Sequence, residues 1–434
     1  MEKIGNKKII NAWAMYDWAN SVYNLVITAT IFPIYYKAVT TTRDDAGNEI
    51  SNLVTFWGIE FKNTALYDFA LAFAYLVIAA IIPLLSGIAD YSGSKKRFMQ
   101  FFCYLGALSC TLMYFFDATN LGFGIGMAVL ACMGFTGSLV FYNAYLPEIA
   151  PPEMQDKVSA KGFALGYLGS AILLIVNLVL VMKQETGAEK LQMMRYAFLS
   201  TGAWWFVFSF IPFYYLPNSK NKNTQHESYF FKGYQELRKV WLQLKHEKQL
   251  TRFLTAFFVY SMGVQTVMLV ATHFGSEEIK LESGQLITTI LIIQFVALFG
   301  AFLFSFSSRK LGNIFTLKIA VVIWSLICIG TFLLVYTAAH FYIVAAFVGL
   351  VMGGIQALSR STYSKLLPET DDHTSFFSFY DVTEKLSIVF GMLSFGIISQ
   401  LSSDMRKPIV VLILFFVAGF LLLLRIPKTK HIEN

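Results

Sequence analysis

The sequence predicts an all-α membrane protein with twelve transmembrane helices arranged in two six-helix bundles. Three observations predict this class. First, the 434 residues are 56% hydrophobic and 14% charged, with a mean hydropathy of +0.57, whereas soluble domains typically carry about 25% charged residues. Second, the apolar residues fall in runs long enough to cross a bilayer. Third, one long polar stretch divides these runs into two equal sets.

The apolar runs are counted against the length that a membrane requires. A helix needs about 20 mostly apolar residues to cross about 30 Å of hydrocarbon. The amino-terminal MEKIGNKKII is not followed by a short apolar core and a small-residue cleavage site, so we expect the first run to stay in the membrane. The predicted spans are approximately 12–36, 64–89, 97–117, 122–146, 159–182, 196–216, 251–273, 284–307, 314–337, 341–366, 378–401 and 408–426.

The polar stretch at 217–250 marks the predicted domain boundary, with one bundle at 1–216 and the other at 251–434. Its second half places apolar residues among lysines and glutamates, which indicates either an amphipathic helix at the membrane surface or a solvated linker with a helical portion. These apolar residues are Phe231, Leu237, Val240, Trp241 and Leu244.

The distribution of basic residues predicts the orientation. Counting Lys and Arg in the loops gives 21 on the side of the amino terminus and nine on the other side. Basic loops favour the cytoplasm, so we expect both termini to be cytoplasmic. The net charge of +7 is therefore read as an orientation signal, since no basic stripe with interleaved aromatics indicates a nucleic-acid partner.

An internal repeat accompanies the division into two halves. The fourth span ends in FYNAYLPE and the tenth in STYSKLLPE, and 221 residues separate Pro147 from Pro368. Proline often follows a helix end, so a short shared motif can arise by chance. Its agreement with the division of the spans favours duplication, which is common in transporters.

The loop between the second and third spans, SGIADYSGSKKRF at 86–98, resembles the cytoplasmic loop signature of the major facilitator superfamily. Asp90, Gly93 and Lys95 match that signature, and Lys96 and Arg97 add positive charge. The resemblance implies that Asp90 contacts a neighbouring helix N-terminus and basic residues of the loop, which holds one conformation. The second half carries a degraded copy, SSRKLGN at 307–313, without an aspartate.

Two further stretches resemble one branch of that superfamily, the vacuolar amino-acid effluxers associated with autophagy and their bacterial relatives. These are YDWANSVYN at 16–24, and the pair GGIQALSRSTYSKLLPE and FFSFYDVTEKLSIVFG between Gly353 and Gly391. Ser378, Glu384 and Met392 depart from the branch pattern in the eleventh span. The resemblance implies amino acids or similar small metabolites as substrates.

Ionisable residues within spans are candidate functional residues, because a charge in lipid is costly. In the first span, Asp17, Asn20, Asn24 and Thr28 share one face at helical spacing, which predicts a wall of a central cavity. Asp17 alone has an alternative interpretation, as an interfacial acid near a helix N-terminus. Arg360 is interpreted either as a partner for a buried or substrate carboxylate, or as a side chain that reaches the interface.

Asp381 and Lys385 are four residues apart, so they either neutralise each other or bind substrate, and Glu384 adds an unexplained acid. The uncharged candidates for the cavity are Tyr142, Asn143, Gln265, Gln294, Gln356 and Tyr380. No residues are proposed as catalytic groups or metal ligands, and no cofactor is expected. The four cysteines lie in apolar runs, and GFGIG at 122–126 follows no strand, so neither metal binding nor dinucleotide binding is indicated.

These patterns predict a secondary active transporter rather than an enzyme, which moves small solutes by alternating access between its two bundles. Asp17 favours coupling to protons. An uncoupled facilitator and a transporter-like sensor remain as alternatives. We expect a functional monomer in a lipid bilayer, in a bacterial inner membrane rather than a vacuolar membrane.

Overall fold

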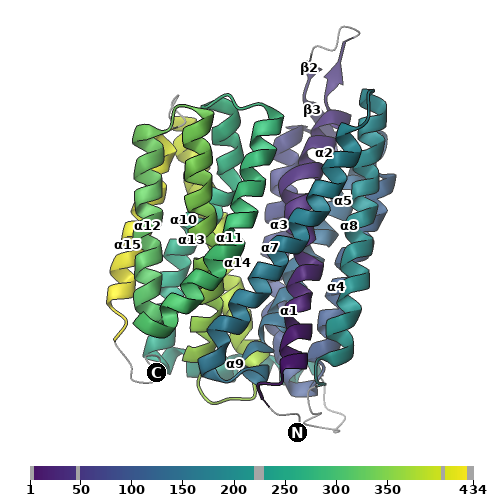
Figure 1. Cartoon of the computed structure of the whole chain (residues 1–434). Helices are drawn as coiled ribbons and strands as arrows, with labels where there is room; N and C mark the ends of the chain where they lie inside the picture. Colours follow the sequence, from purple (N-terminus) through teal and green to yellow (C-terminus); the bar gives the residue numbers. More distant parts are fainter. Residues whose placement is uncertain (1–3, 45–48, 219–228, 402–405, 428–434) are drawn as a thin grey trace.

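The computed structural model describes residues 4–44, 49–218, 229–401 and 406–427. Over these residues twelve long helical segments stand side by side, and one further helix lies across one end of them (Figure 1). The first described residues and the last lie at this same end. The predicted all-α membrane fold is confirmed.

The first bundle begins with one continuous helical segment made of α1, the π-helix η1 and α2. Five long helices and two short elements follow it before the linker. The bounds are α1 Lys7–Val22, η1 Tyr23–Ile31, α2 Phe32–Thr40, α3 Asn63–Ser92, α4 Lys95–Leu112, the 3₁₀ turn η2 Met113–Phe115, α5 Leu121–Asn143, α6 Leu146–Ile149, α7 Pro152–Met182 and α8 Gly187–Tyr215.

The second bundle contains six long helices after the linker. Their bounds are α10 Lys248–Glu277, α11 Ser283–Leu311, α12 Asn313–Leu334, α13 Ala338–Leu366, α14 His373–Leu401 and α15 Lys407–Leu424. The two bundles meet where α3 packs on α14, and where α7 packs on α11 and α13. These two contacts position the residues of the candidate site.

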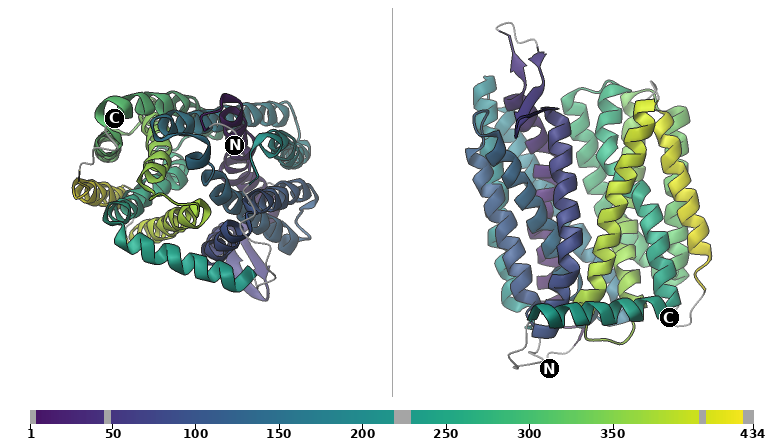
Figure 2. Two further views of the ribbon diagram at one scale, coloured as in Figure 1. Left: turned by 90° about the horizontal axis from the view of Figure 1, so that it is seen from below. Right: turned by 180° about the vertical axis from the view of Figure 1, so that it is seen from behind.

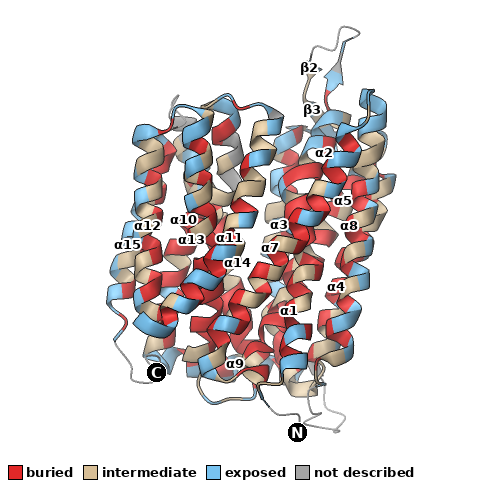
Figure 3. Ribbon diagram, viewed as in Figure 1, coloured by how far each residue is buried: buried red, intermediate tan, exposed pale blue. Residues whose placement is uncertain are grey.

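Ten of the long helical segments have the length and apolarity of membrane spans within the described residues, and α10 and α14 are of similar length. Figure 3 shows buried residues on the faces where helices meet and exposed residues on the outside. On α3 the outer face carries Phe69, Phe73 and Leu76 at helical spacing, all exposed. Such an apolar outer face is suited to contact with lipid tails.

Several helices begin before the predicted spans: α7 begins at Pro152 rather than at 159, and α8 begins at Gly187 rather than at 196. The 30 residues of α3 span about 45 Å at 1.5 Å per residue, whereas the hydrocarbon layer is about 30 Å thick. The extensions carry polar groups, such as Lys95 at the start of α4. Composition alone detects only the part of each helix that lies in lipid.

The loop after α2 forms short strands that the sequence analysis did not predict. Strand β1 (Thr42–Arg43) pairs antiparallel with β2 (Glu49–Ser51), and β3 (Leu53–Phe56) pairs antiparallel with β4 (Ile59–Lys62). The two residues between β3 and β4, Trp57 and Gly58, have φ of 50° and 80°. Two positive φ values fit the tight turn that matches the twist of a hairpin.

Helix α9 (Tyr229–His246) occupies the second half of the polar linker, and residues 219–228 lie outside the described part of the chain. It runs nearly perpendicular to the other helices at the end of the molecule where α1 begins (Figure 2). Val240 and Leu244 face inward and are buried, whereas Phe231 and Trp241 are exposed. Gly233 lies against Gly87 of α3 so closely that a Cβ on either glycine would collide with the other helix.

Candidate functional site

A buried ion pair joins the two bundles. Asp17 of α1 and Arg360 of α13 are 343 positions apart in the chain, and both terminal nitrogens of Arg360 lie 3.2 Å from Oδ2 of Asp17. Asp17 is 4% exposed and Arg360 is 3% exposed. Because a charge left alone at this depth is costly, each residue stabilises the ionised form of the other. The structure thus places Asp17 in contact with a cation of the opposite bundle rather than at a solvated helix end.

The remaining donors of Arg360 also cross to the first bundle. Nε donates to Oγ of Ser159 at 2.9 Å, one terminal nitrogen donates to the carbonyl of Ser159 at 2.9 Å, and the other donates to Oδ1 of Asn143 at 3.2 Å. The guanidinium carbon lies 4.2 Å from the ring centroid of Phe163. A planar guanidinium suits this site because it directs several donors at once and stacks on a ring.

An aromatic pair holds the carboxylate in place. Tyr142 donates its hydroxyl hydrogen to Oδ2 of Asp17 at 2.8 Å. The ring of Trp13 stacks on Tyr142 with centroids 4.4 Å apart, and its Nε1 donates to the carbonyl of Tyr142 at 2.9 Å. Trp13 is one helical turn before Asp17 on the same face, so α1 supplies both the acid and the ring that positions its partner.

Gly162 of α7 allows these groups to meet. A Cβ at this position would overlap Oδ2 of Asp17 and would lie 3.0 Å from the hydroxyl of Tyr142. Gly162 and Ser159 are not predicted as site residues from the sequence, because a small residue in a membrane helix usually indicates helix packing. The close approach shows that the first turns of α7 form one wall of the ion-pair site.

We expect Gly162→Ala to reduce transport by at least about tenfold, because the methyl group must displace the Asp17 carboxylate or the Arg360 guanidinium. Initial uptake rates in vesicles, normalised to the amount of folded protein, would measure this. Gly126→Ala in α5 is the matched control, since a Cβ there meets no atom within 4 Å. Equal rates for the two variants would show that the contact at Gly162 is unimportant.

The polar face predicted along the first span is interrupted by the π-helix. Asp17 and Asn20 are buried in α1, Asn24 is exposed in η1, and Thr28 is partly buried there. The residue spacing of an α-helix therefore applies only as far as Val22, after which the π-helix begins. Segments of π-helix often occur at functional sites. An exposed asparagine at this depth is expected to face water between the bundles, since lipid would leave its amide without partners.

A second charged cluster lies on α14. Nζ of Lys385 is 3.1 Å from Oδ1 of Asp381 and 3.0 Å from Oε2 of Glu384. Gln265 of α10 donates to Oε1 of Glu384 at 3.3 Å. Tyr380, one turn before Glu384, is buried and stacks on Phe257 with centroids 4.4 Å apart. The structure therefore brings Gln265, Tyr380, Asp381 and Lys385 together, and it adds Glu384.

The two remaining glutamines have separate environments. Gln356 of α13 accepts a hydrogen bond from the hydroxyl of Tyr167 in α7, which is a further polar contact between the bundles. Gln294 of α11 is 7% exposed, and its Oε1 has no hydrogen-bond partner among the described residues. Neither glutamine contacts the Asp17 and Arg360 pair directly in the hydrogen bonds described for those two residues.

The loop at 86–98, which is the first of two latches between the bundles, contacts the opposite bundle through Asp90. Its two carboxylate oxygens accept from the backbone N–H groups of Thr374 and Ser375 at 3.2 and 2.7 Å, and from the Ser375 hydroxyl at 2.7 Å. These donors form the first turn of α14, where free N–H groups and the helix dipole favour an anion. Gly93 ends α3 with φ of 64°, a conformation that glycine adopts without strain.

The basic residues of the loop do not form direct ion pairs with Asp90. Lys95 is 2% exposed and contacts Glu148, which also lies 3.2 Å from Nδ1 of His373. Lys96 donates to the carbonyl of Leu216 at 2.8 Å, and Arg97 is exposed. The expected contact of Asp90 with a helix N-terminus is present, whereas Lys95 pairs with Glu148 and acts on Asp90 only through its charge.

A second latch, which the sequence analysis missed, is built around Asp156 of α7. This carboxylate is 2% exposed and accepts from Ser308 of α11, Asn313 of α12 and Lys365 of α13 at 2.8, 2.8 and 2.7 Å. The degraded loop at 307–313 thus contributes donors, while the acid comes from the other bundle. Together with Asp90, these contacts close the end of the molecule that carries α9.

Helix α9 adds a contact at the same end. Nζ of Lys239 lies 2.7 Å from Oδ2 of Asp372, in the segment that precedes α14. The hydrogen bond to Asp372 raises the pKa of Lys239 above its ordinary value. Lys239 is half-exposed, so this pair contributes little by itself. Its position connects the linker helix to the region that caps Asp90.

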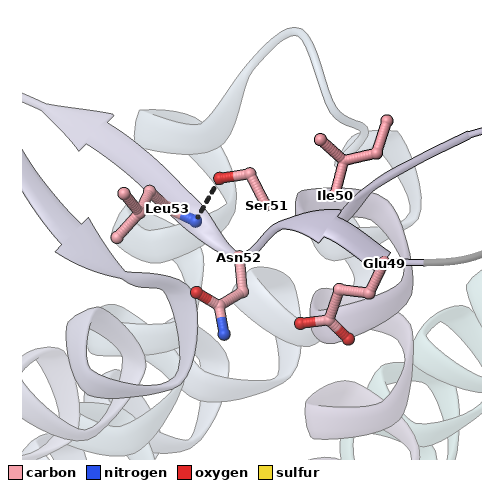
Figure 4. Close-up of a pocket in the computed structure, with 5 residues that line it drawn as sticks. All are labelled: Glu49, Ile50, Ser51, Asn52 and Leu53. Atoms are coloured by element: carbon pink, nitrogen blue, oxygen red, sulfur yellow. Dashed lines mark hydrogen bonds between the residues drawn. The ribbon is translucent and has the colours of Figure 1, made fainter.

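A surface pocket lies far from these clusters in the chain. It is formed by five consecutive residues, Glu49 to Leu53, where the backbone N–H of Leu53 donates to the Ser51 hydroxyl at 3.1 Å (Figure 4). These residues belong to the hairpin at the end of the molecule opposite α9 (Figure 1). The pocket contains none of the charged residues that join the bundles, so it is not a candidate for the transport site.

The chain is similar to known proteins over almost its whole length. The family described as "Vacuole effluxer Atg22 like" matches residues 5–434. The uncharacterized MFS-type transporter YxiO of Bacillus subtilis is 30% identical, over 96% of this chain and 94% of that protein. Autophagy-related protein 22 of Kluyveromyces lactis is 28% identical, over 84% of this chain and 79% of that protein.

Solved structures of major facilitator superfamily transporters share the fold. The transporter FucP superposes with a TM-score of 0.70 at 12% identity, covering 98% of this chain and 100% of FucP. The human organic anion transporter MFSD10 gives a TM-score of 0.71 at 10% identity, over 96% and 99% of the two chains. The family and its structural neighbours are transporters rather than enzymes. The chain therefore belongs to the Atg22-like vacuole effluxer family, as a multi-pass membrane transporter of the major facilitator superfamily.

Proposed function

We propose that this protein transports amino acids or similar small metabolites across a bacterial plasma membrane, and that protons drive the transport through the Asp17 and Arg360 pair. The observation that carries this proposal is the burial of a titratable acid against a cation of the opposite bundle. The bacterial relative supports the location, and the family description as a vacuole effluxer supports a transport role.

The proposed cycle follows from the charges. With Asp17 ionised, Arg360 binds it and the end of the molecule that carries α9 is closed. When Oδ2 of Asp17 takes up a proton, the ion pair loses its Coulombic attraction, and Arg360 is released from the first bundle. The bundles, taken as residues 1–216 and 251–434, then rock and open the predicted cytoplasmic side. A monomer contains both partners of the pair.

Substrate enters this cycle from the side opposite α9 in the closed conformation. The exposed Asn24 and the partly exposed Gln265 lie further from the α9 end than Asp17, on helices of both bundles. Amide groups can bind the carboxylate and ammonium groups of an amino acid. The first and the last described residues lie on the closed side, which the basic loops predict to be cytoplasmic.

The deciding experiment compares the wild type with Asp17→Asn in reconstituted vesicles. We expect the wild type to accumulate an amino acid against its gradient when a pH gradient is imposed. In Asp17→Asn this accumulation should fall at least about tenfold, because the amide cannot release a proton. Exchange of substrate across the membrane should persist. A panel of labelled amino acids and sugars would identify the substrate.

The control variant is Glu185→Gln, which changes an exposed acid in the loop before α8. It should accumulate substrate as the wild type does. Retention of gradient-driven accumulation by Asp17→Asn, with an unchanged pH profile, would contradict proton coupling through Asp17. Equilibration without accumulation in the wild type would instead favour an uncoupled facilitator.

A further inference from the structure

The charged cluster on α14 contains two acids and one base. Lys385 contacts both Asp381 and Glu384, and each carboxylate lies within 3.1 Å of the same Nζ. When all three groups are ionised, the cluster carries one net negative charge. The Asp17 and Arg360 pair is neutral, so it offers no compensating charge.

The cluster lies deep in the membrane. Lys385 is about 18 Å along the axis of α14 from His373, at 1.5 Å per residue, which is near the middle of a layer about 30 Å thick. Helix α14 packs here on α3 of the first bundle. Tyr75 of α3 is close enough to interact electrostatically with both carboxylates. The cluster is therefore at the interface between the bundles.

Two carboxylate oxygens of the cluster can accept a further donor. Asp381 is 2% exposed, and its Oδ2 is buried without a hydrogen-bond partner among the described residues. The side chain of Glu384 is 23% exposed, and its Oε1 receives only a long hydrogen bond of 3.3 Å from Gln265 in the contacts described. A buried acceptor without a donor is costly, so the site favours a ligand that brings donors.

The net charge of the cluster indicates which charge the ligand should carry. An ammonium group has three donors and one positive charge, and it would satisfy the free oxygen of Asp381 and the open side of Glu384. A zwitterionic amino acid leaves the net charge of the site unchanged. An amino acid with a second ammonium or guanidinium group neutralises it, and an acidic amino acid doubles it.

We propose that Asp381 and Glu384 bind the amino group of the substrate, that Lys385 binds its carboxylate, and that Glu384 makes the transporter prefer substrates with a net positive charge. This inference rests on the proposed function, because it assigns the substrate class of the same transport pathway. Lys385 bridges the two acids and donates to the carboxylate of the substrate. The expected order of affinity is lysine, then leucine, then glutamate.

The test measures half-saturation concentrations for labelled lysine, leucine and glutamate in vesicles that contain the full chain. We expect the wild type to bind lysine at least about tenfold more tightly than leucine. Glu384→Gln should bring the two values within about twofold of each other, because the site becomes neutral. Glu384→Asp keeps the charge and should keep the order, which guards against a loss caused only by misfolding.

The control is Glu60→Gln, an exposed acid in β4, which should not change the order. An unchanged preference for lysine in Glu384→Gln would overturn the inference while leaving amino-acid transport intact. A changed pH profile without a changed substrate order would overturn it as well, since Glu384 would then bind a proton. Absence of amino-acid uptake by the wild type would overturn both this inference and the proposed function.

Discussion

Arg360→Ala is expected to abolish transport and to lower the thermal stability of the protein. The substitution removes five hydrogen bonds that cross between the bundles and leaves the Asp17 carboxylate buried without a cation. Breaking a buried pair by removing one partner typically costs about 3–5 kcal/mol. Vesicle uptake and the melting temperature of the purified protein, measured at neutral pH, would show both effects.

The double variant Asp17→Asn with Arg360→Ala separates the two effects. Because it removes the unpaired charge, it should recover more than half of the lost stability but none of the proton-driven accumulation. Arg309→Ala, which alters an exposed arginine at the end of α11, is the control and should behave as the wild type. A stable, fully active Arg360→Ala protein would show that the pair has no role in coupling the bundles.

The arrangement of this pair could be anticipated only in part from the sequence. Asp17 and Arg360 were both recognised because ionisable residues are rare in membrane spans, and a pairing between them was one of the alternatives. Ser159, Gly162 and Glu148 could not be recognised, because they are ordinary residues in the sequence. Their importance depends on contacts between residues 53 or more positions apart, which no local pattern encodes.

The fold itself was more accessible to prediction. Twelve apolar runs of the right length were sufficient to predict the helices, since only helices satisfy their backbone groups within lipid. The short strands between Thr42 and Lys62 were missed because they bury little apolar surface. The π-helix at Tyr23–Ile31 was missed because apolar composition does not distinguish one helical hydrogen-bond register from another.

The two latches show how a repeat can be preserved while its residues exchange places. In the first half, the acid at the end of α3 binds the start of α14. In the second half, the end of α11 and the start of α12 supply the donors, and the acid lies at the start of α7. Both arrangements join the loop of one bundle to a helix start of the other. The missing aspartate at 307–313 therefore marks an exchange of roles rather than a lost contact.

Asp156→Asn is consequently expected to open the α9 end of the protein. The amide cannot neutralise Lys365, whose side chain is only 11% exposed, so the closed conformation loses a charged contact among three helices. We expect the ratio of open to closed protein to rise by at least about tenfold, which corresponds to about 1.4 kcal/mol. Distances between spin labels at Lys157→Cys and Lys310→Cys, two exposed positions on α7 and α11, would measure this ratio.

Labelling is favourable because all four native cysteines are buried. Glu153→Gln changes an exposed acid on the same helix and should leave the distance distribution as in the wild type. Adding Lys365→Gln to Asp156→Asn removes the unpaired cation, so it should restore folding if the single variant is unstable, while the open population stays raised. If the single and double variants both remained as closed as the wild type, Asp90 and its neighbouring contacts would be sufficient to hold this end shut. The transporter would then have one latch, and the contacts of Asp156 would only pack α7 against its neighbours.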